Sequence, residues 1–123
     1  MRNELKQEYE HVGIVTSGDF LQGGSIGSIS KGEYIVRLMN LVGYDAIALG
    51  NHEFDNGAAE LARRLKNLKA DVVCANYDFT GTSLEGIVKP YTILKRGGKK
   101  IGVIGLLTDV SSVVDVSMAQ GIQ

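Results

Sequence analysis

The sequence predicts an α/β fold with a parallel sheet, and three observations point to this class. Short apolar runs of strand length alternate along the chain with longer segments of helical periodicity. The chain has 16 glycines and a single proline, which suits many tight turns at strand ends. A glycine pair at 97–98 separates two further strand-like runs and predicts a hairpin. Strands that alternate with helices are typical of a parallel sheet with crossover helices.

The first part of the chain predicts a short helix, a strand and a longer helix. Residues 2–10 are polar and suit a short surface helix, and residues 12–17 form a strand-like run. Ser30 and Glu33 have capping-box spacing, in which each side chain satisfies a free backbone N–H. The helix that they open is expected to end at Gly43, a favoured residue after a helix. Its predicted apolar face consists of Ile35, Leu38, Met39 and Val42.

The middle of the chain predicts a strand, a helix and a strand. Residues 45–49 and 71–76 are the two apolar runs, and Asp55 or Asn56 is expected to cap the helix between them. Cys74 lies in the second of these strands without another cysteine, so we interpret it as a small buried hydrophobic residue. The helix is expected to carry basic residues outward and an apolar face made of Leu61, Ala62, Leu65 and Leu68.

The last third predicts a β-hairpin with strands at 91–96 and 99–107. We find no internal repeat, low-complexity tract or domain boundary, so residues 1–123 are expected to form a single domain. Neither end of the chain coincides with a recognisable stop signal. We therefore expect the domain to be truncated at both ends.

Composition narrows the range of partners. The chain is 44% hydrophobic and 22% charged, as is ordinary for a globular protein. Its net charge of −1 gives no electrostatic reason to bind a nucleic-acid polymer or a membrane surface. No apolar run approaches the roughly 20 residues that span a bilayer, and the first ten residues are too charged for a secretion signal. Composition therefore favours neither a nucleic-acid polymer nor a membrane as the partner.

Two polar clusters follow the first two predicted strands. Gly18 and Asp19 come after the first strand, and residues 50–55, Gly-Asn-His-Glu-Phe-Asp, come directly after the second. In an open α/β sheet, ligands bind at the carboxyl ends of the strands. Carboxylate, amide and imidazole groups are also metal ligands. The two clusters therefore predict a shared metal site.

These clusters support a resemblance to a known family. Residues 18–19 and 50–55 are similar to two signature blocks of the calcineurin-like metallophosphoesterases. The longer match over 18–23, 43–46 and 50–55 resembles the 5′-nucleotidase branch, which includes 2′,3′-cyclic phosphodiesterases and UDP-sugar hydrolases. The resemblance implies a four-layer sandwich of two β-sheets flanked by helices. Residues 1–123 would be part of its catalytic domain.

The resemblance also implies metal-dependent hydrolysis of phosphate esters, with nucleotides as the expected substrates. The cofactors would be two divalent ions, with zinc, manganese, iron and magnesium all left open by the ligand types. Asp19 would bridge both ions, since a carboxylate commonly holds a metal pair together. Asn51 would bind one ion through its neutral carbonyl oxygen.

His52 and Asp55 are the predicted catalytic residues. An imidazole can donate a proton at neutral pH, so His52 would assist the leaving oxygen and stabilise the transition state. Asp55, three residues later, could hold the ring in one tautomer. In the resembling branch the matching pair forms such a dyad. For Glu53 we expect a supporting or packing role rather than metal ligation. No substrate-binding residue is indicated.

Part of the family's pattern is missing from this sequence. The family also uses an Asp-x-His pair on the first strand and further histidines later in the chain. Here no Asp precedes Asp19, and His11 and His52 are the only histidines. We therefore expect an incomplete metal site in residues 1–123 alone.

Two alternatives to an enzyme are consistent with part of the sequence. One is a truncated or degenerate non-catalytic domain that serves as a binding or structural module, and the missing ligands favour it. The other, a Rossmann-like domain, is disfavoured because residues 23–27 lack the fingerprint spacing. The sequence indicates no compartment, although members of the resembling family are often periplasmic, secreted or at the cell surface.

Overall fold

The computed structural model describes residues 2–21 and 32–109. These residues form two sheets, a parallel sheet with strand order β1–β2–β3–β4 and an antiparallel hairpin of β5 and β6. The strands are β1 (Val15–Thr16), β2 (Ala46–Ala48), β3 (Asp71–Val73), β4 (Val88–Lys89), β5 (Tyr91–Arg96) and β6 (Lys99–Ile104). The helices are α1 (Arg2–Glu8), α3 (Glu33–Val42), the 3₁₀ helix η1 (Asn51–Phe54) and α4 (Ala58–Leu65).

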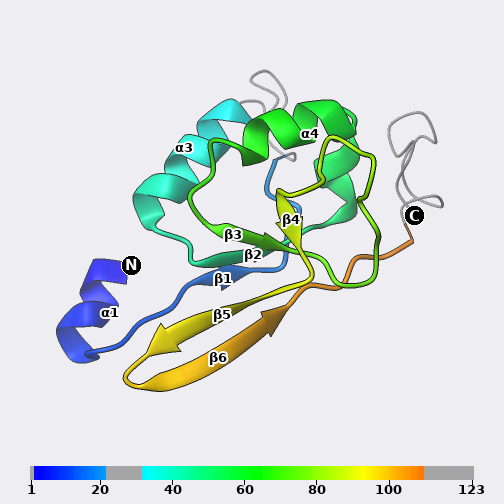
Figure 1. Cartoon of the computed structure of the whole chain (residues 1–123). Helices are drawn as coiled ribbons and strands as arrows, with labels where there is room; N and C mark the ends of the chain where they lie inside the picture. The colour runs from blue at the N-terminus through cyan, green and yellow to red at the C-terminus, as the bar shows by residue number, and fades with distance from the viewer. Residues whose placement is uncertain (1, 22–31, 110–123) are drawn as a thin grey trace.

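Helices and hairpin lie on opposite sides of the parallel sheet. Helices α3 and α4 cover one face, and β5 and β6 lie on the other side (Figure 1). Helix α1 buries no residue and lies apart from the helical layer (Figure 1). The predicted α/β class, with two sheets and flanking helices, is confirmed. None of the helices over residues 2–21 and 32–109 is long and apolar enough to cross a membrane.

The main hydrophobic core lies between the helical layer and the parallel sheet. Side chains from α3, η1 and α4 meet those of β3 there, because each of these helices presents an apolar face to the sheet. The most deeply buried members of this core are Leu49, Phe54, Leu61 and Leu84. Cys74 is also buried in this core, which confirms its interpretation as a small hydrophobic residue.

The buried face of α3 differs from the predicted one. Val36 and Met39 are buried, whereas Leu38 and Val42 are exposed. Helix α3 carries apolar residues in adjacent pairs at 35–36 and 38–39. Two apolar stripes, shifted by one residue around the helix, therefore have almost the same periodicity. Packing against the sheet selects the stripe that the periodicity could not distinguish. The predicted end of α3 is confirmed, since the Gly43 N–H donates to the carbonyl of Met39 at 3.0 Å.

Several predicted boundaries are also wrong. Helix α4 begins at Ala58 after Gly57, because η1 occupies the preceding residues and displaces Asp55 and Asn56 from the cap position. The predicted capping residue Ser30 lies outside the described residues, and Gly32 precedes α3. All three predicted parallel strands are shorter than their apolar runs, and β6 ends at Ile104. Strand β4 was not predicted, because two residues give no periodic signal.

One carboxylate fastens the amino-terminal edge of the parallel sheet. Asp45, just before β2, accepts the Ile14 N–H at 2.9 Å and pairs with Arg2 at 3.0 Å and Arg96 at 2.6 Å. Burial raises the pKa of Asp45, but the Ile14 hydrogen bond and the two guanidinium charges together lower it below its ordinary value. Asp45 therefore joins α1, the segment before β1, β2 and β5 at the edge opposite the predicted site.

Candidate functional site

The predicted site residues meet at the carboxyl edge of β1 and β2. These strands are parallel neighbours, with Val15 opposite Ala46 and Thr16 opposite Ile47, so the loops that follow them emerge side by side. Asp19 in the first loop has φ 57°, an uncommon value that Asp tolerates better than most residues. Its Oδ1 atom accepts the backbone N–H of His52 in the second loop at 3.1 Å.

Two glycines allow the backbones of these loops to touch. A Cβ at Gly18 would overlap the backbone nitrogen of Gly50 and would lie 2.7 Å from the carbonyl carbon of Leu49. A Cβ at Gly50 would lie 2.7 Å from the backbone nitrogen of Asp19 and would overlap its carboxylate. Both distances are far inside van der Waals contact, so only glycine fits at either position. The close approach brings Asp19 beside Asn51 and His52.

Glu53 ties the same two loops together from within. Its Oε2 accepts the N–H groups of Asp19 at 2.7 Å and Gly50 at 2.6 Å. Its Oε1 accepts those of Phe20 at 2.7 Å and Leu21 at 3.3 Å. Only 2% of Glu53 is exposed. Burial raises the pKa of Glu53, while the four N–H donors act in the opposite direction because they favour the carboxylate.

His52 and Asp55 form a hydrogen-bonded pair on the solvent-exposed side of the site. The Nδ1 atom of His52 lies 2.9 Å from Oδ2 of Asp55, and the side chains are 55% and 35% exposed. The hydrogen bond to Asp55 and the Asp55 charge raise the pKa of His52, and the Asp19 and Glu53 charges add to the effect. His52 is thus a solvent-accessible imidazole, and the neighbouring carboxylates favour its protonated form.

Asp19 and Asn51 are the candidate metal ligands. Asp19 is exposed, Asn51 is half-buried, and Oδ2 of Asp19 makes no hydrogen bond to a described residue. A carboxylate oxygen and an amide oxygen fit part of a divalent-cation coordination sphere. Over residues 2–21 and 32–109, no group of three or more His, Cys, Asp or Glu side chains is arranged to hold a metal. These two side chains are therefore a partial donor set.

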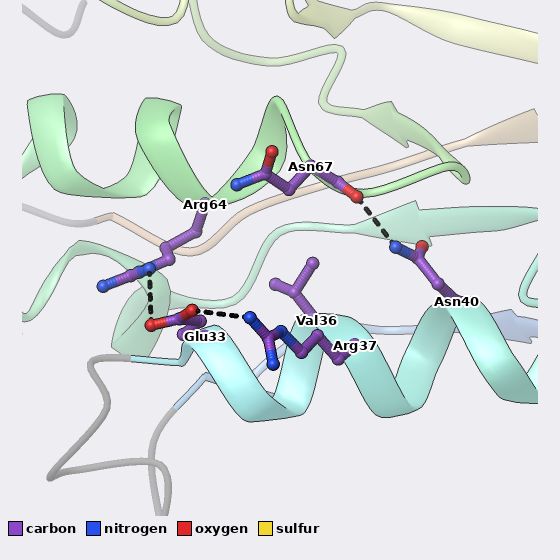
Figure 2. Close-up of a pocket in the computed structure, with 6 residues that line it drawn as sticks. All are labelled: Glu33, Val36, Arg37, Asn40, Arg64 and Asn67. Carbon is purple, nitrogen blue, oxygen red and sulfur yellow. Dashed lines mark hydrogen bonds and ion pairs between the residues drawn. The ribbon is translucent and has the colours of Figure 1, made fainter.

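A separate polar pocket of about 270 Å³ lies between α3 and α4. Figure 2 shows Glu33 between Arg37 and Arg64, with ion-pair distances of 3.1 and 3.7 Å. The amide of Asn40 crosses to the Asn67 carbonyl at 2.7 Å and so links the two helices. The pocket lies on the helical layer, and no predicted site residue lines it.

Sequence reasoning named the side chains at the edge, but it missed how they are held. Glu53 was expected to support the site, and its four N–H partners from two loops are visible only in the structure. Asn76 is the last residue of the run 71–76, and its sequence context indicated no role for it. Its amide pairs with both the N–H and the carbonyl of Leu107, at 2.9 and 2.7 Å, and so fixes the segment after β6 beside the end of β3. Its position after a strand was the only available signal.

The family follows from comparison with known proteins. The family model of the calcineurin-like phosphoesterases matches residues 1–120. The chain belongs to this family, whose members use divalent metals. The expected resemblance is thereby confirmed.

The relatives are 5′-nucleotidases and proteins similar to them. The chain is 40% identical over 115 residues to the snake venom 5′-nucleotidase of Gloydius brevicauda, covering 90% of this chain and 20% of that protein. It is also 40% identical over 109 residues to protein UshA of Escherichia coli, covering 89% and 20%. Among solved structures, the 5′-nucleotidase precursor of Thermus thermophilus matches with a TM-score of 0.81 at 34% identity, covering 86% and 21%. The chain thus spans about a fifth of the length of these relatives.

Proposed function

We propose that this chain supplies the carboxyl-edge site of a phosphoesterase that hydrolyses nucleotides with the help of divalent metals. The observation that carries the proposal is the His52–Asp55 pair, 2.9 Å apart, in the turn whose backbone also bonds to Asp19. This arrangement places a proton donor next to candidate metal ligands, which is what cleavage of a phosphate ester requires. Family membership and the 5′-nucleotidase relatives support the same reaction.

His52 acts as the acid in this proposal. Asp55 holds Nδ1, which leaves Nε2 as the ring nitrogen that gives a proton to the departing oxygen. The raised pKa keeps the ring protonated over a wider range of neutral pH, and the cationic form also stabilises negative charge on the phosphoryl group.

Asp19 and Asn51 are the ligands in this proposal, with Asp19 as the bridging residue. When bound, a divalent metal pair neutralises charge on the phosphoryl oxygens and lowers the pKa of a water molecule. Asp19 would contribute the Oδ2 atom, since Oδ1 already accepts the His52 N–H. Zinc, manganese, iron and magnesium are compatible with these oxygen donors.

The acid role of His52 is tested by replacing each histidine in turn. The natural protein that contains this chain is incubated with Mn²⁺ and AMP, a 2′,3′-cyclic nucleotide or a UDP-sugar, and product formation is measured. His52→Ala should lower kcat by about 10²–10⁴-fold, the usual contribution of a general acid, with metal content nearly unchanged. His11→Ala is the matched control, because His11 is exposed beside Glu10 on another segment. Loss of metal on His52→Ala would show that the acid role is wrong.

The ligand role of Asp19 makes the opposite prediction for metal content. Asp19→Ala should lose bound Mn²⁺ and activity together, because it removes the carboxylate that is proposed to bridge the ions. Asp78→Ala is the control, since Asp78 is an exposed loop carboxylate that bonds locally to Thr80. An Asp19→Ala protein that retains its full metal content would refute the bridging role. If the unaltered protein hydrolyses none of the three substrates, a non-catalytic binding module becomes the better interpretation.

A further inference from the structure

We propose that Glu53 is the positioning residue of the site, and that its buried carboxylate sets the placement of Asp19 relative to Asn51 and His52. The catalytic part of this inference rests on the proposed function. The positioning part does not, because it concerns the two loops themselves.

The hydrogen-bond partners of Glu53 come from both loops. A single carboxylate accepts four backbone N–H groups, three from residues 19–21 and one from Gly50. Oε2 alone bonds to both loops, at 2.7 and 2.6 Å, so this one atom joins them directly. Hydrogen bonds to an ionised acceptor are shorter and stronger than neutral ones. No other side-chain acceptor in residues 2–21 and 32–109 has backbone donors from both loops.

The bonds of Glu53 are made to the candidate ligand Asp19 and to the residue just before Asn51. Asp19 is itself one of the donors, and Gly50 immediately precedes Asn51. Glu53 lies between His52 and Asp55 on the turn of η1 but points inward, with 2% of the residue exposed, while His52 points outward. The carboxylate is therefore too enclosed to touch a substrate. It acts through the residues that it holds.

The backbone conformation of the Asp19 loop needs support from its surroundings. Its conformation includes two successive residues of positive φ, Gly18 at 101° and Asp19 at 57°. A non-glycine residue in this region is held there by its surroundings, since the conformation is intrinsically unfavourable. Over residues 2–21 and 32–109, Glu53 is the acceptor for the N–H groups of three consecutive residues, and a donor that loses its acceptor away from water is costly. Removing the carboxylate should therefore release this loop from the His52 turn.

The test is Glu53→Gln, which is nearly isosteric. An amide has one acceptor oxygen, so in either orientation two of the four N–H groups lose their acceptor and face an NH₂ group. Amide hydrogen exchange is measured at residues 19–21 and 50, with Ile47 and Val73 reporting on the core. We expect exchange about tenfold faster at two or more of the four amides and unchanged exchange in the core. We also expect kcat and Mn²⁺ affinity to fall about 10–100-fold, as for other residues that orient ligands, with KM changing little.

Glu85→Gln is the matched control. Glu85 also uses a carboxylate oxygen to accept a backbone N–H, that of Gly81 at 2.8 Å, but it is exposed in a remote loop. It should leave exchange at the site, Mn²⁺ affinity and kcat unchanged. Glu53→Asp is the second variant, for use if the amide variant does not fold. It keeps the charge but is one methylene shorter, so it cannot reach both loops, and it should show the same local changes.

Two results would overturn the inference. Wild-type exchange and kcat in either Glu53 variant would show that the carboxylate does not set the site. Faster exchange throughout the core, with activity falling only in proportion to the folded fraction, would show that Glu53 merely stabilises the fold. If the unaltered protein hydrolyses no nucleotide, the proposed function fails, while the exchange measurement still decides whether Glu53 positions the loops.

Discussion

The His52–Asp55 pair shows how one neighbour sets the chemistry of a single exposed side chain. The 2.9 Å hydrogen bond is the largest cause of the raised pKa of His52. Asp55→Asn keeps the size of the side chain and removes its charge. The pKa of His52 should therefore fall in this variant, because an opposite charge favours the imidazolium form.

An NMR titration of the His52 ring protons checks this prediction, with the His11 signals as an internal reference. The direction of this pKa shift also predicts how the pH profile of hydrolysis changes. If protonated His52 is the acid, the alkaline limb of kcat should move to lower pH in Asp55→Asn. An unchanged His52 titration would mean that the pair does not control the ring.

At this scale, the sequence predicted which residues gather but not all of what they do. Asp19, Asn51, His52 and Asp55 were predicted to share one edge because each follows a strand of the same parallel sheet, and the structure places all four there. Glu53 could not be assigned its four donors. Its partners lie up to 34 residues away, and one of its bonds depends on the positive φ of the Asp19 loop. Contacts of this kind depend on three-dimensional placement rather than on spacing.

Among the elements, α4 offers a sharp test of the core. Leu61 is 1% exposed against the sheet, whereas Leu41 on α3 is 82% exposed. Leu61→Ala should lower the free energy of unfolding by about 2–5 kcal/mol, since it removes buried methyl groups and leaves a cavity. Leu41→Ala makes the same chemical change and should alter it by less than about 0.5 kcal/mol. Urea denaturation of the chain measures both, and equal losses would contradict the described packing.

The elements also show where a sequence pattern stops being informative. The face of α4 was predicted well, with Leu61, Ala62 and Leu65 buried, because one apolar stripe stands out among polar residues. Its polar face was predicted less well, since Arg64 is buried and pairs with Glu60 at 2.8 Å. The face of α3 was predicted only in part, because two apolar stripes compete: Met39 is buried as expected, but Leu38 and Val42 are exposed. A clear stripe fixes a helix's orientation, and a broad one leaves the choice to packing.

For the molecule as a whole, the amino-terminal edge of the sheet governs stability in acid. Asp45 has a lowered pKa in the folded state, so its stabilising contribution is fully present above the unfolded-state pKa of about 3.9 and is lost as the pH falls through the folded-state pKa. Asp45→Asn should therefore lower the free energy of unfolding by about 1.5–3 kcal/mol at pH 7, the usual range for hydrogen bonds to a charged group. The difference should shrink towards pH 3.

Denaturation curves between pH 3 and pH 7 check the prediction. Glu8→Gln serves as the control, because Glu8 is exposed on α1, a helix that buries no residue. A difference between Asp45→Asn and the unaltered chain that does not depend on pH would show that shape, rather than charge, accounts for the effect. A carboxylate at the amino-terminal edge of the sheet thus stabilises the fold, whereas carboxylates at the carboxyl edge serve the proposed chemistry.

The contact between Gly18 and Gly50 has a consequence at the level of the gene. Every single-nucleotide missense change in a glycine codon introduces a residue with a Cβ atom, and neither position has room for one. Neither codon therefore has a tolerated amino-acid change one nucleotide away. The two loops are also coupled, because enlarging either glycine pushes against the other loop and no second change at the partner glycine can make it smaller. These two codons can change only by synonymous substitution while the loops keep their present contact.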